Sequence, residues 1–394
     1  MVVVALQTGQ MIASFQDKIL EIAHEIHKYP ELSEQEFKTT EKIRSFLTEM
    51  NIELLEEQPS TGVLAIIRGG QPGKTVALRA DIDALPVLED PSHKIVSQNQ
   101  GVMHACGHDI HTAALLGAAA ALNRQHQSLC GTVLLIFQPA EEVSTGAKAV
   151  IDTGVFDRIR PDAFFSFHVM PSVPEGKIGI RQGPIMAAQK GFTIRIAGKG
   201  GHGASPHLTH DPLIAATRTV DALQTIASRQ IDPAAPFVLS VCSIHGGTAF
   251  NIIPDSMEIT GTCRLMDNSI SRQVEQWITD IAQKTADIHS CAAEVTFFRR
   301  LPALENATPL VSIAQDTAAA LLGPENIICQ DIMMGSEDFS LYSEIAPIFM
   351  YHMGMGVTQG VNYSLHNPHF LVPDAITLQS AELLAQTALR YLEK

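Results

Sequence analysis

The sequence lacks the basic runs and long apolar stretches that nucleic-acid-binding and membrane proteins carry. Its 394 residues contain no extended run of Lys or Arg, and 42 acidic against 27 basic residues give a formal net charge of −15. A field of this sign repels phosphate backbones and anionic membrane surfaces, so neither nucleic acid nor a membrane is an expected partner. No apolar stretch reaches the length that spans a bilayer.

The sequence also lacks a secretory signal and a disulfide framework. Its first residues, MVVVALQTGQ, are apolar but have neither a basic start nor a small-residue cleavage site. Six cysteines scattered over a chain of this length do not form the pattern of a small disulfide-stapled domain. We therefore expect a cytoplasmic protein with reduced cysteines, most of them small core residues.

What the chain contains is typical of a folded globular protein with more than one domain. Hydrophobic residues make up 45% of the sequence and charged residues 18%, far from the composition of a disordered chain. We see no internal repeat and no low-complexity segment. Because 394 residues exceed what a single core usually supports, two domains are expected.

The first part of the chain alternates buried strands with amphipathic helices. Apolar positions from Ile12 to Ile26 predict one helix, those from Phe37 to Met50 a second, and the run from His111 a third. Short apolar runs predict four strands, at 63–68, 75–79, 132–137 and 162–167. This alternation favours an α/β fold with a mixed, largely parallel sheet and helices on both faces.

The order of elements changes near residue 188. The patterns predict strand, helix, strand, strand, helix, strand, at 189–198, 212–229, 237–244, 256–265, 269–288 and 293–300. This order is the split β-α-β (ferredoxin-like) unit, a small sheet with helices on one face. From Pro302 the α/β pattern resumes, with a strand at 348–354 and a closing helix after Pro373. We expect a catalytic domain of 1–187 and 302–394, interrupted by an inserted α+β lid domain at 188–301.

Residues able to bind a metal gather where the predicted strands end. Cys106 and His108 lie in HACGHDIH, a match that alone could equally mark ordinary loop residues. Three further clusters follow strands: Glu141 with Glu142, His168, and the motif LHNPHF with His366 and His369. Open α/β sheets place their sites at the carboxyl ends of strands. Together the clusters predict a metal site.

The mixture of donor types indicates the kind of ion. A thiolate, a carboxylate and several imidazoles suit manganese, zinc, cobalt or nickel, and do not form an oxygen cage for calcium. The predicted ligands are too many for one tetrahedral centre and too few to fill two: Cys106, His108, Glu142, His168 and His366. We therefore expect two divalent ions whose remaining positions take water and substrate.

Two carboxylates are candidates for supporting roles. Glu141, next to the predicted ligand Glu142, cannot easily bind the same ion and is available as a general base. Asp83 could orient a metal-bound imidazole, or could simply end a strand. A nucleophilic Cys106 is an alternative, but a thiol hydrolase would not need the paired glutamates. The glycine-rich GKGGHG lacks the ending of a phosphate-binding loop, so we do not expect nucleotide binding.

The chain resembles the aminoacylase and carboxypeptidase family of di-metal amidohydrolases, in the branch that contains hippurate hydrolase and auxin-conjugate hydrolases. The matching stretches run nearly end to end: HKYPELSEQE, LRADIDALP, MHACGHDIHTA, FQPAEE, FSFHVMP, GKGGHGASPH, GGTAFNIIPD, MGSEDF and SLHNPHF. The resemblance implies a catalytic domain with an inserted lid, the ligand set given above, Glu141 as general base and Asp83 as the metal-supporting aspartate. Other branches have a His ligand at the position of Asp81, which is absent here.

The resemblance also assigns roles within the inserted domain. It implies that His202 helps to polarise the scissile carbonyl, and that Asn251 and Arg264 contact the substrate's carbonyl and free carboxylate. A homodimer formed through this domain is a further expectation by analogy. The predicted activity is hydrolysis of an N-acyl-L-amino acid to a carboxylate and a free amino acid. The alternatives are a dipeptidase, a deacetylase of a biosynthetic N-acetyl amino acid and, outside enzymes, a metal-loaded binding protein.

Overall fold

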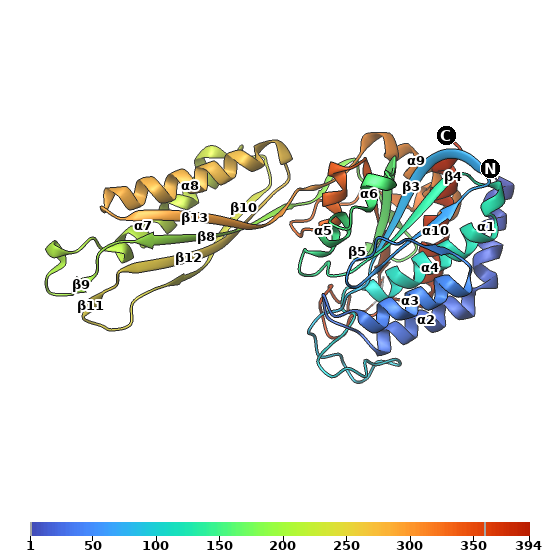
Figure 1. Cartoon of the computed structure of the whole chain (residues 1–394), viewed down its shortest axis with the longest axis horizontal. Helices are drawn as coiled ribbons and strands as arrows, with labels where there is room; N and C mark the ends of the chain where they lie inside the picture. The colour runs from blue at the N-terminus through green and yellow to red at the C-terminus, as the bar shows by residue number, and fades with distance from the viewer. Residues whose placement is uncertain (1, 358–359) are drawn as a thin grey trace. The chain divides into compact units, whose positions relative to one another are not determined.

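The computed structural model describes residues 2–357 and 360–394, which form two compact units (Figure 1). The first consists of Met1–Gly183, Glu305–Asp331 and Asp338–Lys394, and the second of Pro184–Leu304 and Ile332–Glu337. A first unit built from both ends of the chain follows the predicted interruption. The short segment Ile332–Glu337 was expected in the first unit and instead belongs to the second.

The first unit is built on an eight-stranded mixed sheet. In spatial order its strands are β1 (Glu53–Leu54), β2 (Val63–Arg68), β4 (Cys130–Gln138), β3 (Gln71–Asp81), β5 (Ala163–Pro174), β16 (Ile348–Gly356), β6 (Ile178–Gly179) and β15 (Ile327–Ile328). The central pairs β4–β3, β3–β5 and β5–β16 are parallel. Every residue of β16 is buried, because helices cover parallel strands on both faces, and this burial explains the continuous apolar runs.

Helices surround this sheet, and the predicted α/β class is confirmed. They are α1 (Val2–Ser14), α2 (Gln16–Lys28), α3 (Phe37–Glu49), α4 (His108–Arg124), α5 (Gly146–Ile151), α6 (Val155–Arg158), α9 (Thr308–Leu322) and α10 (Asp374–Leu392). The single helix expected around Ile12–Ile26 is wrong, because the chain breaks at Phe15 between α1 and α2. Among the described residues, no helix is both long and apolar enough to cross a membrane.

The ends of the parallel strands bring polar residues to one edge of the sheet. β3 ends at Asp81 and β4 at Gln138, and these two residues are partners in the register. The expectation that His168 ends its strand is wrong: β5 continues to Pro174, because β16 keeps pairing with it as far as Gly356. His168 therefore lies within a paired strand.

The second unit is the predicted split β-α-β unit. Its antiparallel sheet has the order β10 (Phe237–His245), β12 (Ser256–Leu265), β8 (Ala188–Ala197) and β13 (Ala292–Leu301). Its helices are α7 (Pro212–Thr225) and α8 (Ser271–Ile288), and the carboxylate of Asp211 accepts hydrogen bonds from the first turn of α7 as predicted. A small hairpin pairs β9 (Gly201–His202) with β11 (Ile252–Ile253). The chain enters and leaves through β7 (Gly183–Met186) and β14 (Leu304–Asn306).

Candidate metal centre

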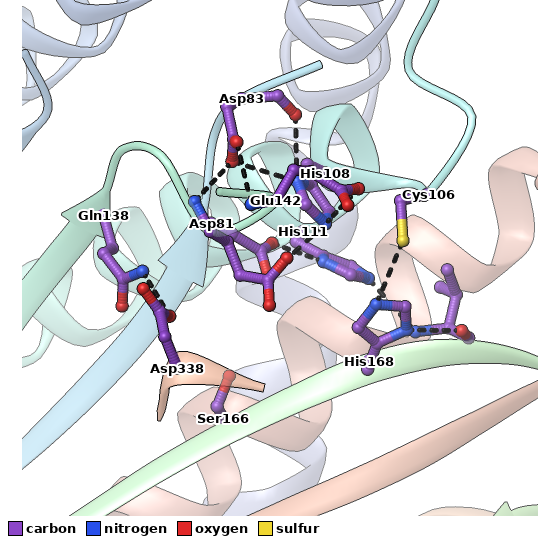
Figure 2. A network of polar contacts seen from close by, with 12 residues as sticks. Asp81, Asp83, Cys106, His108, His111, Gln138, Glu142, Ser166, His168 and Asp338 are labelled. Carbon is purple, nitrogen blue, oxygen red and sulfur yellow. Dashed lines mark hydrogen bonds and ion pairs between the residues drawn. The ribbon is translucent and has the colours of Figure 1, made fainter. Parts of the chain in front are cut away.

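The loop before α4 presents Cys106 and His108 from a sharply turned backbone. Gly107 caps the helix with φ +85°, and a Cβ there would lie 2.5 Å from Cγ2 of Val169. Only glycine fits such a position without strain. The Sγ atom of Cys106 is buried and lies 3.5 Å from Nε2 of His168 (Figure 2). The loop thus directs a thiol toward an imidazole carried by β5.

Two buried histidines expose the same nitrogen. Nδ1–H of His108 donates to the carbonyl oxygen of Asp83 at 2.9 Å, and Nδ1–H of His168 donates to the carbonyl oxygen of Val169 at 2.6 Å. A carbonyl oxygen only accepts, so Nδ1 carries the proton and the lone pair of the neutral ring lies on Nε2. This arrangement prepares an imidazole to bind a metal.

The carboxylate of Glu142 faces these nitrogens. Its Oε1 lies 3.9 Å from Nε2 of His108 and 3.5 Å from Nε2 of His366. Oε1 of Glu142 and Nε2 of His108 are buried, and neither has a hydrogen-bond partner among the residues that the structure describes. Candidate ligand atoms lie within 4.8 Å of one another in each of three groups: Cys106–His108–His168, Cys106–Glu142–His366 and His108–Glu141–Glu142. The structure therefore brings together all five predicted ligands and the predicted base.

Asp83 organises the loop that carries the two glutamates. Its Oδ1 accepts the backbone N–H of Glu141 and its Oδ2 that of Glu142, each at 3.1 Å, and Oδ2 also accepts the hydroxyl of Ser33 at 2.6 Å. Its own carbonyl holds His108. Burial alone would raise the pKa of Asp83, but hydrogen bonds and the charge of His108 lower it. Asp83 therefore remains ionised and positions both a ligand and the base.

The electrostatics of the cluster fit a bound cation. Burial alone would lower the pKa of His108, but the carboxylates of Asp81, Asp83 and Glu142 outweigh it and raise the pKa to about 10. The carboxylates thus favour a positive charge at this position, which a metal ion supplies. Burial, with the charges of Glu142 and nearby carboxylates, raises the pKa of Cys106 well above its usual range. A thiol nucleophile needs a lowered pKa, so this environment favours ligation by a thiolate that the cation ionises.

A buried ionic network beneath the site was missed from the sequence. Arg79 is fully buried, and its guanidinium donates to Asp81 at 2.6 Å and to Asp338 at 3.1 Å. Asp338 also accepts a hydrogen bond from Gln138 at 2.7 Å (Figure 2). The only available signal was the position of Arg79 in the motif LRADIDALP and of Asp338 in MGSEDF. The network fixes the ends of β3 and β4, from which the ligand loops start.

His111 is another buried histidine at the site, and it is not a ligand. Its Nε2 accepts the backbone N–H of Val169 at 3.1 Å, so its Nδ1–H donates to Asp81 at 2.6 Å. Both nitrogens are occupied. Burial lowers the pKa of His111 to about 4, which keeps the ring neutral beside His168. Asp81, in turn, has one oxygen bound to Arg79 and the other to His111, and is thereby held as a supporting group.

Comparisons with known proteins identify this arrangement. The model of peptidase family M20/M25/M40 matches residues 77–390. The chain belongs to this family. It is 38% identical to N-acetylcysteine deacetylase of Bacillus subtilis over 96% of this chain and 98% of that protein. It is 36% identical to thermostable carboxypeptidase 1 of Saccharolobus solfataricus (97% and 98% covered) and 37% identical to IAA-amino acid hydrolase ILR1-like 4 of Arabidopsis thaliana (96% and 86%).

A solved structure of the family supports the metal content. A Bacillus subtilis protein described as a dinuclear metal binding peptidase from the M20 family superposes with a TM-score of 0.83, at 35% identity over 97% of this chain and 99% of that one. The predicted family is therefore confirmed, and this member of family M20/M25/M40 is a metal-dependent amidohydrolase that uses two divalent ions. The donors around Glu142 and His108 fit such a pair.

The remaining predicted site residues lie in the second unit of this family member. His202 is in β9, where it pairs with Ile252 of β11, and Asn251 accepts the backbone N–H of Gly203 at 2.8 Å. The small hairpin therefore brings His202 and Asn251 together. Arg264 lies on β12, where its guanidinium donates to the hydroxyl of Thr262 at 2.5 Å, and burial lowers its pKa. Their roles toward a substrate stay predictions.

Proposed function

We propose that the protein is an N-acyl-L-amino acid amidohydrolase, which cleaves the amide into a carboxylate and a free amino acid. The observation that carries the proposal is the pairing of Glu141 with Glu142: a carboxylate oxygen of Glu141 lies within 4.8 Å of the ligand atoms of both Glu142 and His108. One glutamate can therefore bind metal while its neighbour, held by Asp83, handles a proton. A protein that only bound metal would have no use for the second carboxylate.

In this proposal each residue has one task. The ligands are Cys106, His108, Glu142, His168 and His366. Two divalent ions, when bound, polarise the scissile carbonyl and increase the acidity of water, and manganese, zinc, cobalt and nickel all suit these donors. Glu141 removes a proton from the attacking water and delivers it to the amide nitrogen as the C–N bond breaks.

Residues of the second unit have tasks toward the same substrate in this proposal. His202 donates to the oxygen that gains negative charge, Asn251 contacts the carbonyl, and Arg264 binds the substrate's carboxylate as a fork of donors. Pairing of two chains through this unit, and a cytoplasmic location, are parts of the same proposal.

The names of the relatives support this substrate class. N-acetylcysteine deacetylase and IAA-amino acid hydrolase are both named for acyl groups on an amino-acid nitrogen. Thermostable carboxypeptidase 1 favours a second candidate, the hydrolysis of a peptide with a free carboxyl terminus, which needs the same chemistry and a different acyl pocket.

The test is hydrolysis of matched N-acetyl, N-benzoyl and dipeptide substrates, each as free carboxylate and as carboxamide. Chelation should abolish activity, and manganese, zinc, cobalt or nickel should restore it. Arg264→Ala should raise KM for the carboxylates and barely change it for the carboxamides. Arg195→Ala, which removes an exposed arginine of β8 in the same unit, is the control. Full turnover without metal, or a covalent acyl adduct on Cys106, would contradict the proposal.

A further inference from the structure

A second group of metal-binding side chains lies in the first unit, outside the proposed centre. It consists of Asp90 and His93, on the turn that follows Glu89, and of His369 in the loop that carries His366. One candidate ligand atom from each of Asp90, His93 and His369 lies within 4.8 Å of the other two. No step of the proposed reaction uses these three side chains.

Glu89 prepares His93 to bind a metal through one defined nitrogen. Its Oε1 lies 2.9 Å from Nδ1 of His93, and the side chain of His93 is only 7% exposed. A carboxylate accepts, so Nδ1 carries the proton and Nε2 keeps its lone pair. Supporting carboxylates of this kind are typical of metal-bound histidines. Glu89 is itself fixed by the backbone N–H of Ser97 at 2.6 Å.

Asp90 and His369 are already in direct contact. Nδ1 of His369 touches Oδ2 of Asp90, while Oδ1 of Asp90 accepts the backbone N–H of Ser92 at 2.8 Å. The backbone N–H of Asp90 donates to the carbonyl oxygen of Pro368 at 3.1 Å, which ties the two loops together independently of the side chains. A proton shared between a carboxylate and an imidazole occupies the place that a metal ion would take.

We propose that Asp90, His93 and His369 bind one further divalent transition-metal ion, with water as the fourth ligand. Two imidazoles and one carboxylate suit zinc or cobalt(II), and three protein ligands with one open position form a familiar tetrahedral set. A bound ion would join the turn at 90–93 to residue 369, three positions after the proposed ligand His366. The site therefore braces the loop that carries His366.

The test counts metal ions and identifies their ligands. Metal-free protein is titrated with zinc alone and with cobalt(II) alone, for the wild type, Asp90→Asn and His369→Ala. We expect the wild type to bind one ion more than either variant, or to bind that ion at least about 10-fold more tightly, the smaller loss seen when a group supporting a metal ligand is removed. His24→Ala removes another histidine paired with one aspartate, Asp374 at 2.9 Å, and is the matched control that should keep the ion.

Cobalt(II) separates the two sites by their absorption. A thiolate ligand gives an intense near-ultraviolet charge-transfer band, which reports ions bound beside Cys106, whereas nitrogen and oxygen ligands give only weak visible bands. The extra ion should add visible absorption and leave the thiolate band unchanged. Equal ion content in wild type and both variants, loss of the ion in His24→Ala, or a change of the thiolate band on adding the extra ion would overturn the proposal. Absence of the thiolate band in every protein would instead contradict the proposed centre.

Discussion

Replacing Asp83 with Asn tests whether this carboxylate holds the metal centre together. Both of its oxygens accept from the loop of Glu141 and Glu142, and Oδ2 also accepts from Ser33. An Asn side chain has one accepting oxygen, and its NH₂ group would face a donor on the other side. At least one charge-assisted hydrogen bond is lost, which is worth about 1.5–3 kcal/mol.

That loss should appear as weaker metal binding. An energy of about 1.5–3 kcal/mol corresponds to about a 10- to 150-fold change in an equilibrium constant. We expect Asp83→Asn to lower metal affinity by this factor, measured by competition with a chromophoric chelator, and to lower kcat at saturating metal because Glu141 is no longer fixed. Ser33→Ala is the control: it removes one neutral donor from Asp83 at 2.6 Å and keeps the charge and both amide bonds. It should change affinity by less than about 10-fold, the value of about 1 kcal/mol for one ordinary hydrogen bond. Wild-type metal affinity in Asp83→Asn would refute the reasoning.

Two further predictions concern the paired glutamates and a buried histidine. Glu141→Gln should keep both ions while kcat falls at least about 100-fold, as for a lost general base, whereas Glu142→Gln should lose metal; equal metal content in the two variants would show that the roles are misassigned. Burial alone would lower the pKa of His27, but its hydrogen bonds to Asp109 and Glu89 raise it from 6.5 to about 10. The stability from charged His27 is therefore fully present below about pH 6.5 and is lost as pH rises through about 10. Chemical denaturation across this window should show the free energy of unfolding falling by a few kcal/mol in the wild type and much less in His27→Gln, and identical slopes would contradict the pairing.

Local sequence patterns were sufficient to predict the fold class and most elements. The continuous apolar run of β16 and the order of elements from β8 to β13 follow from burial and periodicity, which are properties of neighbouring residues. The candidate ligands could be predicted for a related reason: loops at the carboxyl ends of parallel strands meet at one edge of a sheet, so chemistry written after different strands converges. Cys106, His108 and Glu142 were therefore found without coordinates.

Tertiary structure alone decided what depends on partners far along the chain. His111 and His168 are both buried histidines in recognisable motifs, yet only their hydrogen bonds show that His111 has both nitrogens occupied while His168 keeps Nε2 for a metal. The pairing of Arg79 with Asp338, 259 residues away, likewise has no local signal. The continuation of β5 beyond His168 was set by β16 rather than by its own residues. Residue type and local spacing thus determined which groups could bind metal, whereas long-range contacts fixed which nitrogen carries the proton and which carboxylate only supports.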